Sequence, residues 1–252
     1  MTVSVCIPMY NESDTVENCA GQLYKMLRGY GERTGNSFEI IFSDDGSTDD
    51  GREKAERFAA DHPGVRVIGY ADNRGKGSAV REGVMASRGD VVLYTDCDLA
   101  YGVDIIEDAV NNIVNGDGAF KADVVIGSRN LTKDGYSGYG FIRRTASKAY
   151  IKMLSLIGGF SLTDSQCGFK IFRTESAKKI FSLCECNSFA FDYEVILIAD
   201  KLGMKIEEMP VKIINHREST VHVAKDSLSM VKDVLRIKRR VKKLDTDRGG
   251  RA

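Results

Sequence analysis

Two carboxylates close the stretch Asp90-Val-Val-Leu-Tyr-Thr-Asp96-Cys97-Asp98, which starts as a run of β-forming residues. Side chains alternate between the faces of a strand, so Asp96 and Asp98 point the same way if the backbone stays extended. Two hard oxygen donors aimed together suit Mg²⁺ or Mn²⁺, which leave coordination positions open for phosphate oxygens. The alternative is a solvated turn, because Asp is common where strands end. The pattern therefore needs support from neighbouring segments.

The segments around this stretch alternate between strand and helix signals. Short β-prone runs bounded by turn residues predict strands, and capped or amphipathic segments predict helices. This alternation predicts an α/β fold with a mainly parallel sheet covered on both faces. A loop rich in Gly and Tyr is expected at 131–140. The expected strands are 3–7, 38–42, 65–70, 91–95, 123–126 and 211–214, and the expected helices are 15–30, 75–87, 103–114, 143–156 and 192–202, with another helix after the turn at 46–50.

Acidic residues follow three of these strands. Asp44 and Asp45 follow the second strand, Asp72 follows the third, and Asp96 follows the fourth. Ligands in parallel sheets bind beyond the carboxyl ends of the strands. The sequence therefore predicts one polar site at that edge.

Two turns at this edge have residues suited to a nucleotide. In Asp44-Asp45-Gly46-Ser-Thr-Asp49, a carboxylate can accept from a nucleobase N–H or a ribose hydroxyl, and Gly46 permits a tight turn. An ordinary turn with Asp49 as a helix cap would explain part of this pattern. In Asn73-Arg-Gly-Lys76-Gly, exposed N–H groups and a lysine suit a phosphate, although a structural turn is favoured for this segment alone.

Two later clusters leave more alternatives open. The polar segment 164–170 predicts only a loop. In Phe189-Ala-Phe-Asp192-Tyr-Glu194, the two carboxylates point in different directions if the segment is helical and in the same direction if it is extended. The acids can therefore stabilise a helix N-terminus or take a catalytic role, and the sequence leaves both alternatives open. Arginine forks suited to phosphate are present at Arg129, Arg143, Arg144 and Arg217.

Composition excludes several classes of protein. The 252 residues carry 36 basic and 36 acidic side chains, so no net charge attracts nucleic acid. The six cysteines lack zinc-framework spacing, the first residues lack a signal-peptide pattern, and no apolar run reaches the length of a membrane span. We therefore expect a cytoplasmic protein with reduced thiols.

The ordered set of motifs resembles the family-2 glycosyltransferases, which have a nucleotide-diphospho-sugar transferase (glycosyltransferase-A type) fold. Within that family the chain is most similar to polyprenyl-phosphate hexosyltransferases, especially the dolichyl-phosphate β-glucosyltransferase group, and more broadly to the dolichyl-phosphate mannosyltransferases. The family motifs are Ile7-Pro-Met-Tyr-Asn-Glu12, Asp44–Asp49, Asn73–Gly77 and Asp96–Asp98, and the narrower likeness rests on Gly127–Arg129, Asp164–Lys170 and Phe191–Glu194.

The resemblance implies a role for each matching position. Asp96 and Asp98 would hold Mg²⁺ or Mn²⁺ and, with Arg129 and Asp192, form the catalytic set. Asp192 or Glu194 would orient hydroxyls of the sugar or the acceptor. The implied nucleotide-binding residues are Pro8, Tyr10, Glu12, Asp45, Lys76, Asp96 and Cys97, and the implied acceptor-phosphate residues are Arg129, Arg143, Gln166 and Arg217.

The expected activity is inverting transfer of a hexose, glucose from UDP-glucose, to a polyprenyl or dolichyl phosphate at the cytoplasmic face of a membrane. A glycan or other hydroxyl acceptor is a second hypothesis and would make Asp192 or Glu194 an indispensable base. A non-catalytic nucleotide-sugar binding module is a third, against which the intact Asp45, Asp96 and Asp98 argue.

The C-terminal segment is expected to differ from the rest. We predict a catalytic domain over 1–224 and a basic amphipathic helix with a tail over 225–252. From residue 232 onward, nine Lys or Arg stand against three Asp. The helix can lie on an anionic membrane, or it can pack its apolar stripe on the protein's own core. The stripe comprises Met230, Val234, Ile237, Val241 and Leu244.

Overall fold

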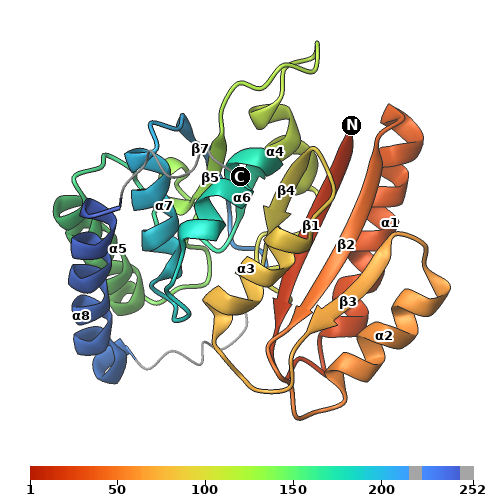
Figure 1. Ribbon diagram of the computed structural model, residues 1–252, viewed down its shortest axis with the longest axis horizontal. Coiled ribbons are helices and arrows are strands. Elements are labelled where there is room, and N and C mark those ends of the chain that lie inside the picture. Colours follow the sequence, from red (N-terminus) through yellow and green to blue (C-terminus); the bar gives the residue numbers. More distant parts are fainter. Residues whose placement is uncertain (216–222, 245–252) are drawn as a thin grey trace.

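The computed structural model describes residues 1–215 and 223–244, without the side chains of 142–143 and 223–231. A seven-stranded sheet runs through the described part, with helices on both of its faces (Figure 1). The strand order is β3-β2-β1-β4-β6-β5-β7. This arrangement is the fold class that the alternating sequence signals predict.

The first half of the chain forms the parallel side of the sheet. Strand β1 lies between β2 and β4, and the pairing of Met9 with Asp44 and of Asp44 with Gly69 aligns three strand ends. The elements are β1 (Thr2–Met9), α1 (Val16–Thr34), β2 (Ser37–Asp44), α2 (Gly51–Asp61), β3 (Val65–Gly69), α3 (Lys76–Ala86) and β4 (Val91–Tyr94).

The second half inserts one antiparallel strand. Strand β6 pairs antiparallel with β4 on one side and with β5 on the other, whereas β7 runs parallel to β5. The elements are α4 (Ile105–Ile113), β5 (Val124–Ser128), the 3₁₀ turn η1 (Arg129–Leu131), α5 (Phe141–Gly158), β6 (Lys170–Arg173), α6 (Thr174–Leu183), α7 (Phe191–Lys201), β7 (Ile206–Pro210) and α8 (Val223–Lys242).

Two expectations for the second half were incomplete or wrong. The sequence reading did not identify β6 and α6. The last strand lies at Ile206–Pro210, not at 211–214. Val211 N–H still donates to Ser128 O at the end of β5 (3.1 Å), but Ile214 N–H donates to Ala100 O in the turn after β4 (2.8 Å). Val211 and Ile213 are buried although they lie outside the strand, and Ile214 is 55% exposed.

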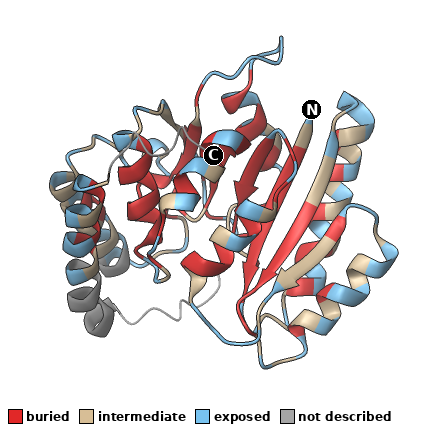
Figure 2. Cartoon of the chain, viewed as in Figure 1, coloured by how far each residue is buried: buried red, intermediate tan, exposed pale blue. Residues whose placement is uncertain are grey.

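The core lies between the sheet and its helices (Figure 2). Consecutive residues of β1, from Val3 to Met9, are all buried, because both faces of this parallel sheet are covered. Burial of both faces explains why the strands appear in the sequence as continuous β-prone runs and not as alternating patterns.

Helix α8 packs on the protein itself. Val234, Ile237 and Val241 from the expected apolar stripe are at most 4% exposed, and α8 contacts α7 and α5. Of the two alternatives, packing on the core is therefore observed for these three residues. Leu244 is partly buried against the core, and the Met230 side chain lies outside the described residues. Within those residues, no helix combines the length and apolar character that crossing a membrane requires.

Candidate active site

The Asp45 carboxylate organises the turn that follows β3. It accepts hydrogen bonds from Tyr70 Oη (2.6 Å), Asn73 Nδ2 (3.0 Å) and the backbone N–H groups of Arg74 (2.9 Å) and Gly75 (2.9 Å). Burial and this carboxylate raise the pKa of Tyr70 to about 12. The side chain expected to bind a nucleotide thus holds the turn 70–75 in shape.

That turn delivers Lys76 to the first position of α3. Gly75, with φ of 103°, and Gly77 both face the backbone around Asn187 too closely for a Cβ atom. Gly77 N–H donates to Asn187 O (2.9 Å). Glycine is needed here because the start of α3 lies directly on another loop, which fixes where Lys76 emerges.

Lys76 forms an ion pair with Asp96 across the strand ends. Its Nζ lies 2.5 Å from Asp96 Oδ1. Burial opposes the charge on Lys76, but the carboxylates of Asp96 and Asp192 outweigh burial and raise its pKa. The structure therefore joins the Asn73–Gly77 and Asp96–Asp98 motifs into one site.

Asp98 lies in a concentration of negative charge. Strand β4 ends at Tyr94, so Asp96 and Asp98 occupy the turn after it and not an extended strand. Burial and the like charge of Asp96 raise the pKa of Asp98, despite a hydrogen bond from Ala100 N–H (3.0 Å), and Glu12 adds to the effect. Like charges held together favour a bound cation.

This donor set fits a hard divalent cation. Carboxylate oxygens are the ligands that Mg²⁺ and Mn²⁺ prefer. Asp96 and Asp98 supply such oxygens, and because burial and the charge of Asp96 raise the pKa of Asp98, a bound cation would favour its ionised form. Within the described residues, no three His, Cys, Asp or Glu side chains are already grouped around one metal position.

The segment 164–170 approaches the same turn. A Cβ atom on Gly168 would lie 2.8 Å from Asp96 Oδ2. Glycine at this position therefore gives the Asp96 carboxylate its space. The sequence predicted only a loop here, and in the structure this loop borders the site next to Asp96.

Asp192 belongs to a buried polar cluster beneath the site. Its Oδ1 accepts from Tyr94 Oη (2.6 Å) and from Lys170 Nζ, and Lys170 also donates to Cys167 O (2.6 Å). Lys170 is fully buried and Asp192 nearly so. A buried charge pair of this kind is stable only when hydrogen bonds complete it, as they do here.

Glu194 points away from Asp192, as expected for two residues in the first turn of a helix. Its Oε2 accepts from the N–H groups of Glu185 (2.9 Å) and Cys186 (2.8 Å), and its Oε1 pairs with Arg240 (2.6 Å). Both oxygens are used, and the side chain is 1% exposed. Glu194 therefore anchors α8 to the loop before α7.

Arg129 pairs with Asp164 through two hydrogen bonds, Nε to Oδ2 (2.6 Å) and Nη2 to Oδ1 (2.8 Å). Burial opposes its charge, but Tyr101 and Asp164 outweigh burial and raise its pKa. Its guanidinium lies 5.1 Å from the Tyr136 ring centroid. The arginine expected to contact phosphate is thus largely engaged within the protein.

The other expected residues differ in position. Pro8 is buried in β1, Tyr10 beyond it is 46% exposed, and Gln166 lies in the loop that precedes β6. Thr15 Oγ1 contacts Cys97 Sγ at 3.8 Å, which places Cys97 against the start of α1. Arg217 and the Arg143 side chain lie outside the described residues.

Sequence reasoning missed several residues that shape the site. Tyr70, Asp164, Gly168 and Lys170 contact expected site residues from distant positions in the chain. The sequence identified the Asp164–Lys170 motif, but no local pattern predicted which side chains its residues contact.

The fold and the acidic site at its carboxyl edge define a nucleotide-sugar transferase of the glycosyltransferase-A type. Residues 4–181 match the model of Glycosyl transferase family 2. The chain belongs to this family and is a glycosyltransferase, which confirms the class expected from the motifs.

Similar proteins extend over nearly the whole chain. A dolichyl-phosphate beta-glucosyltransferase of Saccharomyces cerevisiae is 31% identical over 249 residues, covering 94% of this chain and 74% of the relative. The Homo sapiens protein of the same name is 29% identical and covers 94% and 75%. Glycosyltransferase AglD of Haloferax volcanii is 31% identical over 93% of this chain but only 36% of its own length.

Solved structures confirm the fold. Glucosyl-3-phosphoglycerate synthase of Mycobacterium tuberculosis, solved with Mn²⁺, uridine diphosphate and phosphoglyceric acid, has a TM-score of 0.69 and 20% identity over 97% of this chain and 80% of its own. Mannosyl-3-phosphoglycerate synthase of Rubrobacter xylanophilus has a TM-score of 0.65 and 21% identity over 97% and 76%.

Proposed function

We propose that this protein transfers a hexose, glucose from UDP-glucose, to a polyprenyl or dolichyl phosphate with inversion at the anomeric carbon. The names of the similar proteins from yeast and human support this acceptor. The observation that carries the proposal is that the two carboxylates considered as bases, Asp192 and Glu194, are both engaged within the protein.

A hydroxyl acceptor needs a base to remove its proton, whereas a phosphate monoester does not. The second pKa of such a phosphate is about 6, so it is ionised at neutral pH. Glu194 has both oxygens bonded, and Asp192 is paired with a buried lysine. A site whose candidate bases are held in this way favours an acceptor that is already a nucleophile.

The donor would bind along the turns at the ends of β1 to β4. Tyr10 is exposed there, Glu12 lies near Asp98, and Lys76 emerges between the two motifs. We assign Pro8, Tyr10, Glu12, Asp45 and Cys97 to the nucleotide pocket, with Asp45 acting through the turn it holds. Lys76 would exchange Asp96 for a donor phosphate, which conserves its charge pairing.

Asp96 and Asp98 would hold Mg²⁺ or Mn²⁺. A bound divalent ion supplies positive charge that stabilises the departing nucleoside diphosphate. The protein's own contribution is to position donor and acceptor and to place Lys76 near the charge that develops on the leaving group.

The acceptor phosphate would lie on the other side of Asp96, near η1 and the start of β6. Arg129, whose Nε and Nη2 are bonded to Asp164, would turn its Nη1 to this phosphate. We retain Gln166, Arg143 and Arg217 as further candidates and Asp192 as the residue that fixes Lys170 below the site. The domain division at 224/225 and attachment at the cytoplasmic face of a membrane also belong to this proposal.

The test is a transfer assay with purified protein. Radiolabelled UDP-glucose and GDP-mannose are offered in parallel, with polyprenyl phosphate in detergent and Mg²⁺ or Mn²⁺. We expect label from UDP-glucose in the organic phase, its loss with EDTA, and a decrease of at least about 100-fold for Asp98→Ala. The exposed Asp61→Ala is the matched control and retains activity.

Two results would contradict the proposal. If label enters the organic phase only from GDP-mannose, the donor is GDP-mannose and not UDP-glucose. If the donor is hydrolysed without a lipid product and sugar is transferred to a soluble glycan, the acceptor is a glycan and not a polyprenyl phosphate.

A further inference from the structure

Helix α5 presents an exposed face of unusual composition. Phe141 is 83% exposed and Leu156 is 76% exposed, the two highest values among the large apolar side chains described. Arg144, Lys148 and Lys152 are exposed between them. At 100° per residue these five side chains fall within one arc of the helix. We call them the basic face of α5.

The charges of this face are not neutralised within the helix. The 18 residues of α5 include no Asp or Glu. Arg144 and Lys148 instead lie over the Tyr136 ring, at 5.9 and 5.7 Å from its centroid, and among the described residues no carboxylate pairs with Arg144, Lys148 or Lys152. The face therefore attracts a negatively charged partner.

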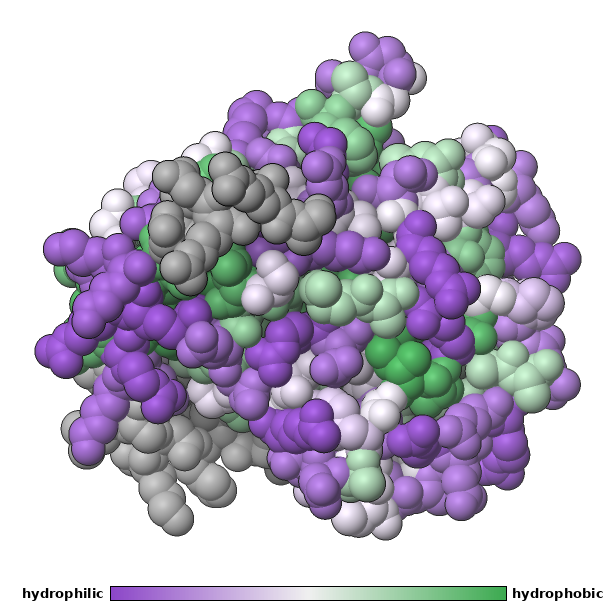
Figure 3. Space-filling view, viewed as in Figure 1, coloured by the Kyte–Doolittle hydropathy of each residue, from purple (hydrophilic) through white to green (hydrophobic). Residues whose placement is uncertain are grey.

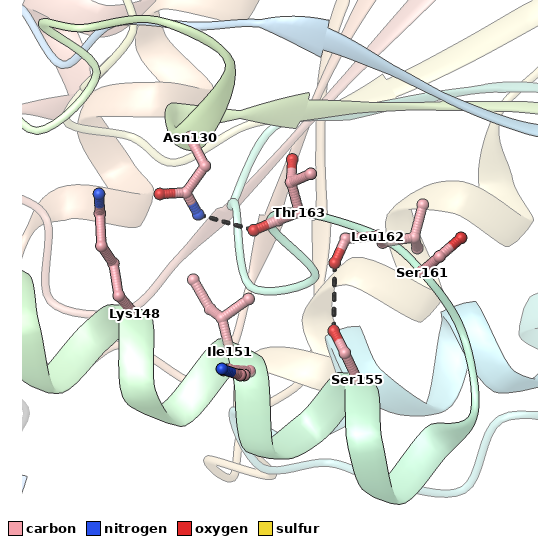
Figure 4. Close-up of a pocket in the computed structure, with 8 residues that line it drawn as sticks. Asn130, Lys148, Ile151, Ser155, Ser161, Leu162 and Thr163 are labelled. Atoms are coloured by element: carbon pink, nitrogen blue, oxygen red, sulfur yellow. Dashed lines mark hydrogen bonds between the residues drawn. The ribbon is translucent and has the colours of Figure 1, made fainter.

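A cavity of about 390 Å³ opens beside the same face (Figure 4). Lys148, Ile151 and Ser155 of α5 form one wall, and Asn130 and Thr163 lie opposite. Asn130 Nδ2 donates to Thr163 O (2.6 Å), which fixes that opposite wall. The lining combines Lys148 and Lys152 with the apolar Ile151 and Leu162, which suits a charged headgroup attached to hydrocarbon.

This face adjoins the acceptor side of the catalytic edge. Tyr136, beneath Arg144 and Lys148, also lies against Arg129 at the end of β5. Helix α8 differs, because Val234, Ile237 and Val241 are buried and its outward side is mostly hydrophilic over the described side chains (Figure 3), with Leu235 42% exposed. Exposed Phe and Leu side chains at the two ends of this face can enter a lipid interface, while the basic side chains between them meet anionic headgroups.

We propose that the basic face of α5 docks this protein on an anionic lipid bilayer. The inference rests on the proposed lipid-phosphate acceptor and deepens it, because docking through α5 would bring the acceptor side of the site to the membrane. Phe141 and Leu156 enter the interface, and Arg144, Lys148 and Lys152 face the anionic headgroups.

Vesicle co-sedimentation of the full chain tests this proposal without any acceptor. Vesicles contain phosphatidylcholine alone, or phosphatidylcholine with about 30 mol% phosphatidylglycerol. The second composition gives the vesicle a negative surface potential like that of an anionic leaflet. We expect binding to the anionic vesicles only. Lys148→Gln/Lys152→Gln should weaken it by about fivefold for each lysine removed, and Phe141→Ser/Leu156→Ser by about tenfold.

Two control variants carry the same loss of charge elsewhere. Lys25→Gln/Arg57→Gln lies on α1 and α2, at the opposite end of the molecule, and Lys242→Gln/Lys243→Gln lies on or just beyond α8. Both should bind anionic vesicles within twofold of the wild type. A larger loss in the α8 variant than in the α5 variants would overturn the assignment to α5.

Transfer to a short, water-soluble polyprenyl phosphate separates this inference from the proposed function. The Phe141→Ser/Leu156→Ser variant should keep its activity on that acceptor while losing vesicle binding. A wild type that makes lipid product but does not bind anionic vesicles refutes the docking proposal and leaves the function intact. Vesicle binding without any transfer refutes the function alone.

Discussion

The two halves of the sheet hold their polar groups in different ways. In the first half, the Asp45 carboxylate accepts hydrogen bonds from uncharged backbone and side-chain donors of one turn, 70–75. In the second half, the carboxylates of Asp192 and Asp164 pair with the cations of Lys170 and Arg129. The first half thus holds its carboxylate with neutral hydrogen-bond donors, and the second holds its carboxylates with buried ion pairs. Removing one partner should therefore have larger consequences in the second half.

The largest expected effect is the loss of the Lys170 ammonium. Lys170→Met leaves Asp192 buried without its cation, which should lower the free energy of unfolding by about 3–5 kcal/mol. Urea denaturation measures this change. The exposed Lys179→Met, on the neighbouring helix α6, should stay within about 0.5 kcal/mol of the wild type.

A double variant sharpens this test. Lys170→Met/Asp192→Leu removes both charges and should recover part of the lost stability, because an apolar pair replaces the ion pair while Tyr94 Oη loses its acceptor. If the double variant is less stable than Lys170→Met, the pair is not the source of the effect.

The next effect concerns the hydrogen bonds of Asp45 in the first half. Asp45→Asn replaces an acceptor of four hydrogen bonds with a group whose amide faces backbone N–H donors, and it should lower the free energy of unfolding by about 2 kcal/mol. It should also raise the KM for the nucleotide sugar. Asp50→Asn removes an exposed pair with Lys54 (3.2 Å) and should change stability by less than about 1 kcal/mol.

A smaller effect is expected where the two halves meet. Gly168→Ala places a Cβ atom 2.8 Å from Asp96 Oδ2 and should lower kcat/KM about tenfold, or about 1.4 kcal/mol, by displacing that carboxylate. Gly21→Ala, in a position of α1 with open space, is the control and should leave kcat/KM unchanged. An unchanged rate for Gly168→Ala would show that Asp96 can shift without consequence.

The smallest effects are opposite in sign for two aspartates. The raised pKa of Asp98 means that its ionised form is disfavoured in the folded protein, so stability is lost as pH rises through that pKa. Asp98→Asn should therefore raise Tm slightly at pH 7 in EDTA, with no gain near pH 3.5.

Asp49 should show the reverse. Burial opposes its charge, but hydrogen bonds from Ser13 N–H (2.9 Å) and Gly51 N–H (3.0 Å) lower its pKa, so its stabilisation is present at neutral pH and lost as pH falls. Asp49→Asn should lower Tm at pH 7 and have less effect in acid. Equal shifts for both variants would contradict this assignment of charges.

The sequence predicted the first half better than the second for a physical reason. Strands ending in acidic turns carry their signals locally, so β1 to β4 and the edge with Asp45 and Asp96 were predicted. Strand β6 is four residues long and lies between two other strands, and no periodicity marks it. Tertiary packing brings Lys170 to Asp192 and Asp164 to Arg129. Local sequence patterns do not encode such pairs.

Helix α8 shows a second limit of sequence patterns. An apolar stripe indicates that one side of a helix is covered, but it does not say by what. Here Val234, Ile237 and Val241 are covered by the protein, whereas Phe141 and Leu156 of α5, which form no regular stripe, remain exposed. We therefore assign the proposed membrane contact to α5 and not to α8.

The Arg129–Asp164 pair closes the excursion that the chain makes between β5 and β6. Because β6 is antiparallel, the excursion leaves and re-enters the sheet at the same edge, and the pair ties its two ends together. The segment 130–163 is closed at its base by this pair, so its length and surface can change while β1 to β4, which carry the proposed donor site, keep their structure. Exchange of residues 130–163 between relatives would then be a route to new acceptors on an unchanged donor site.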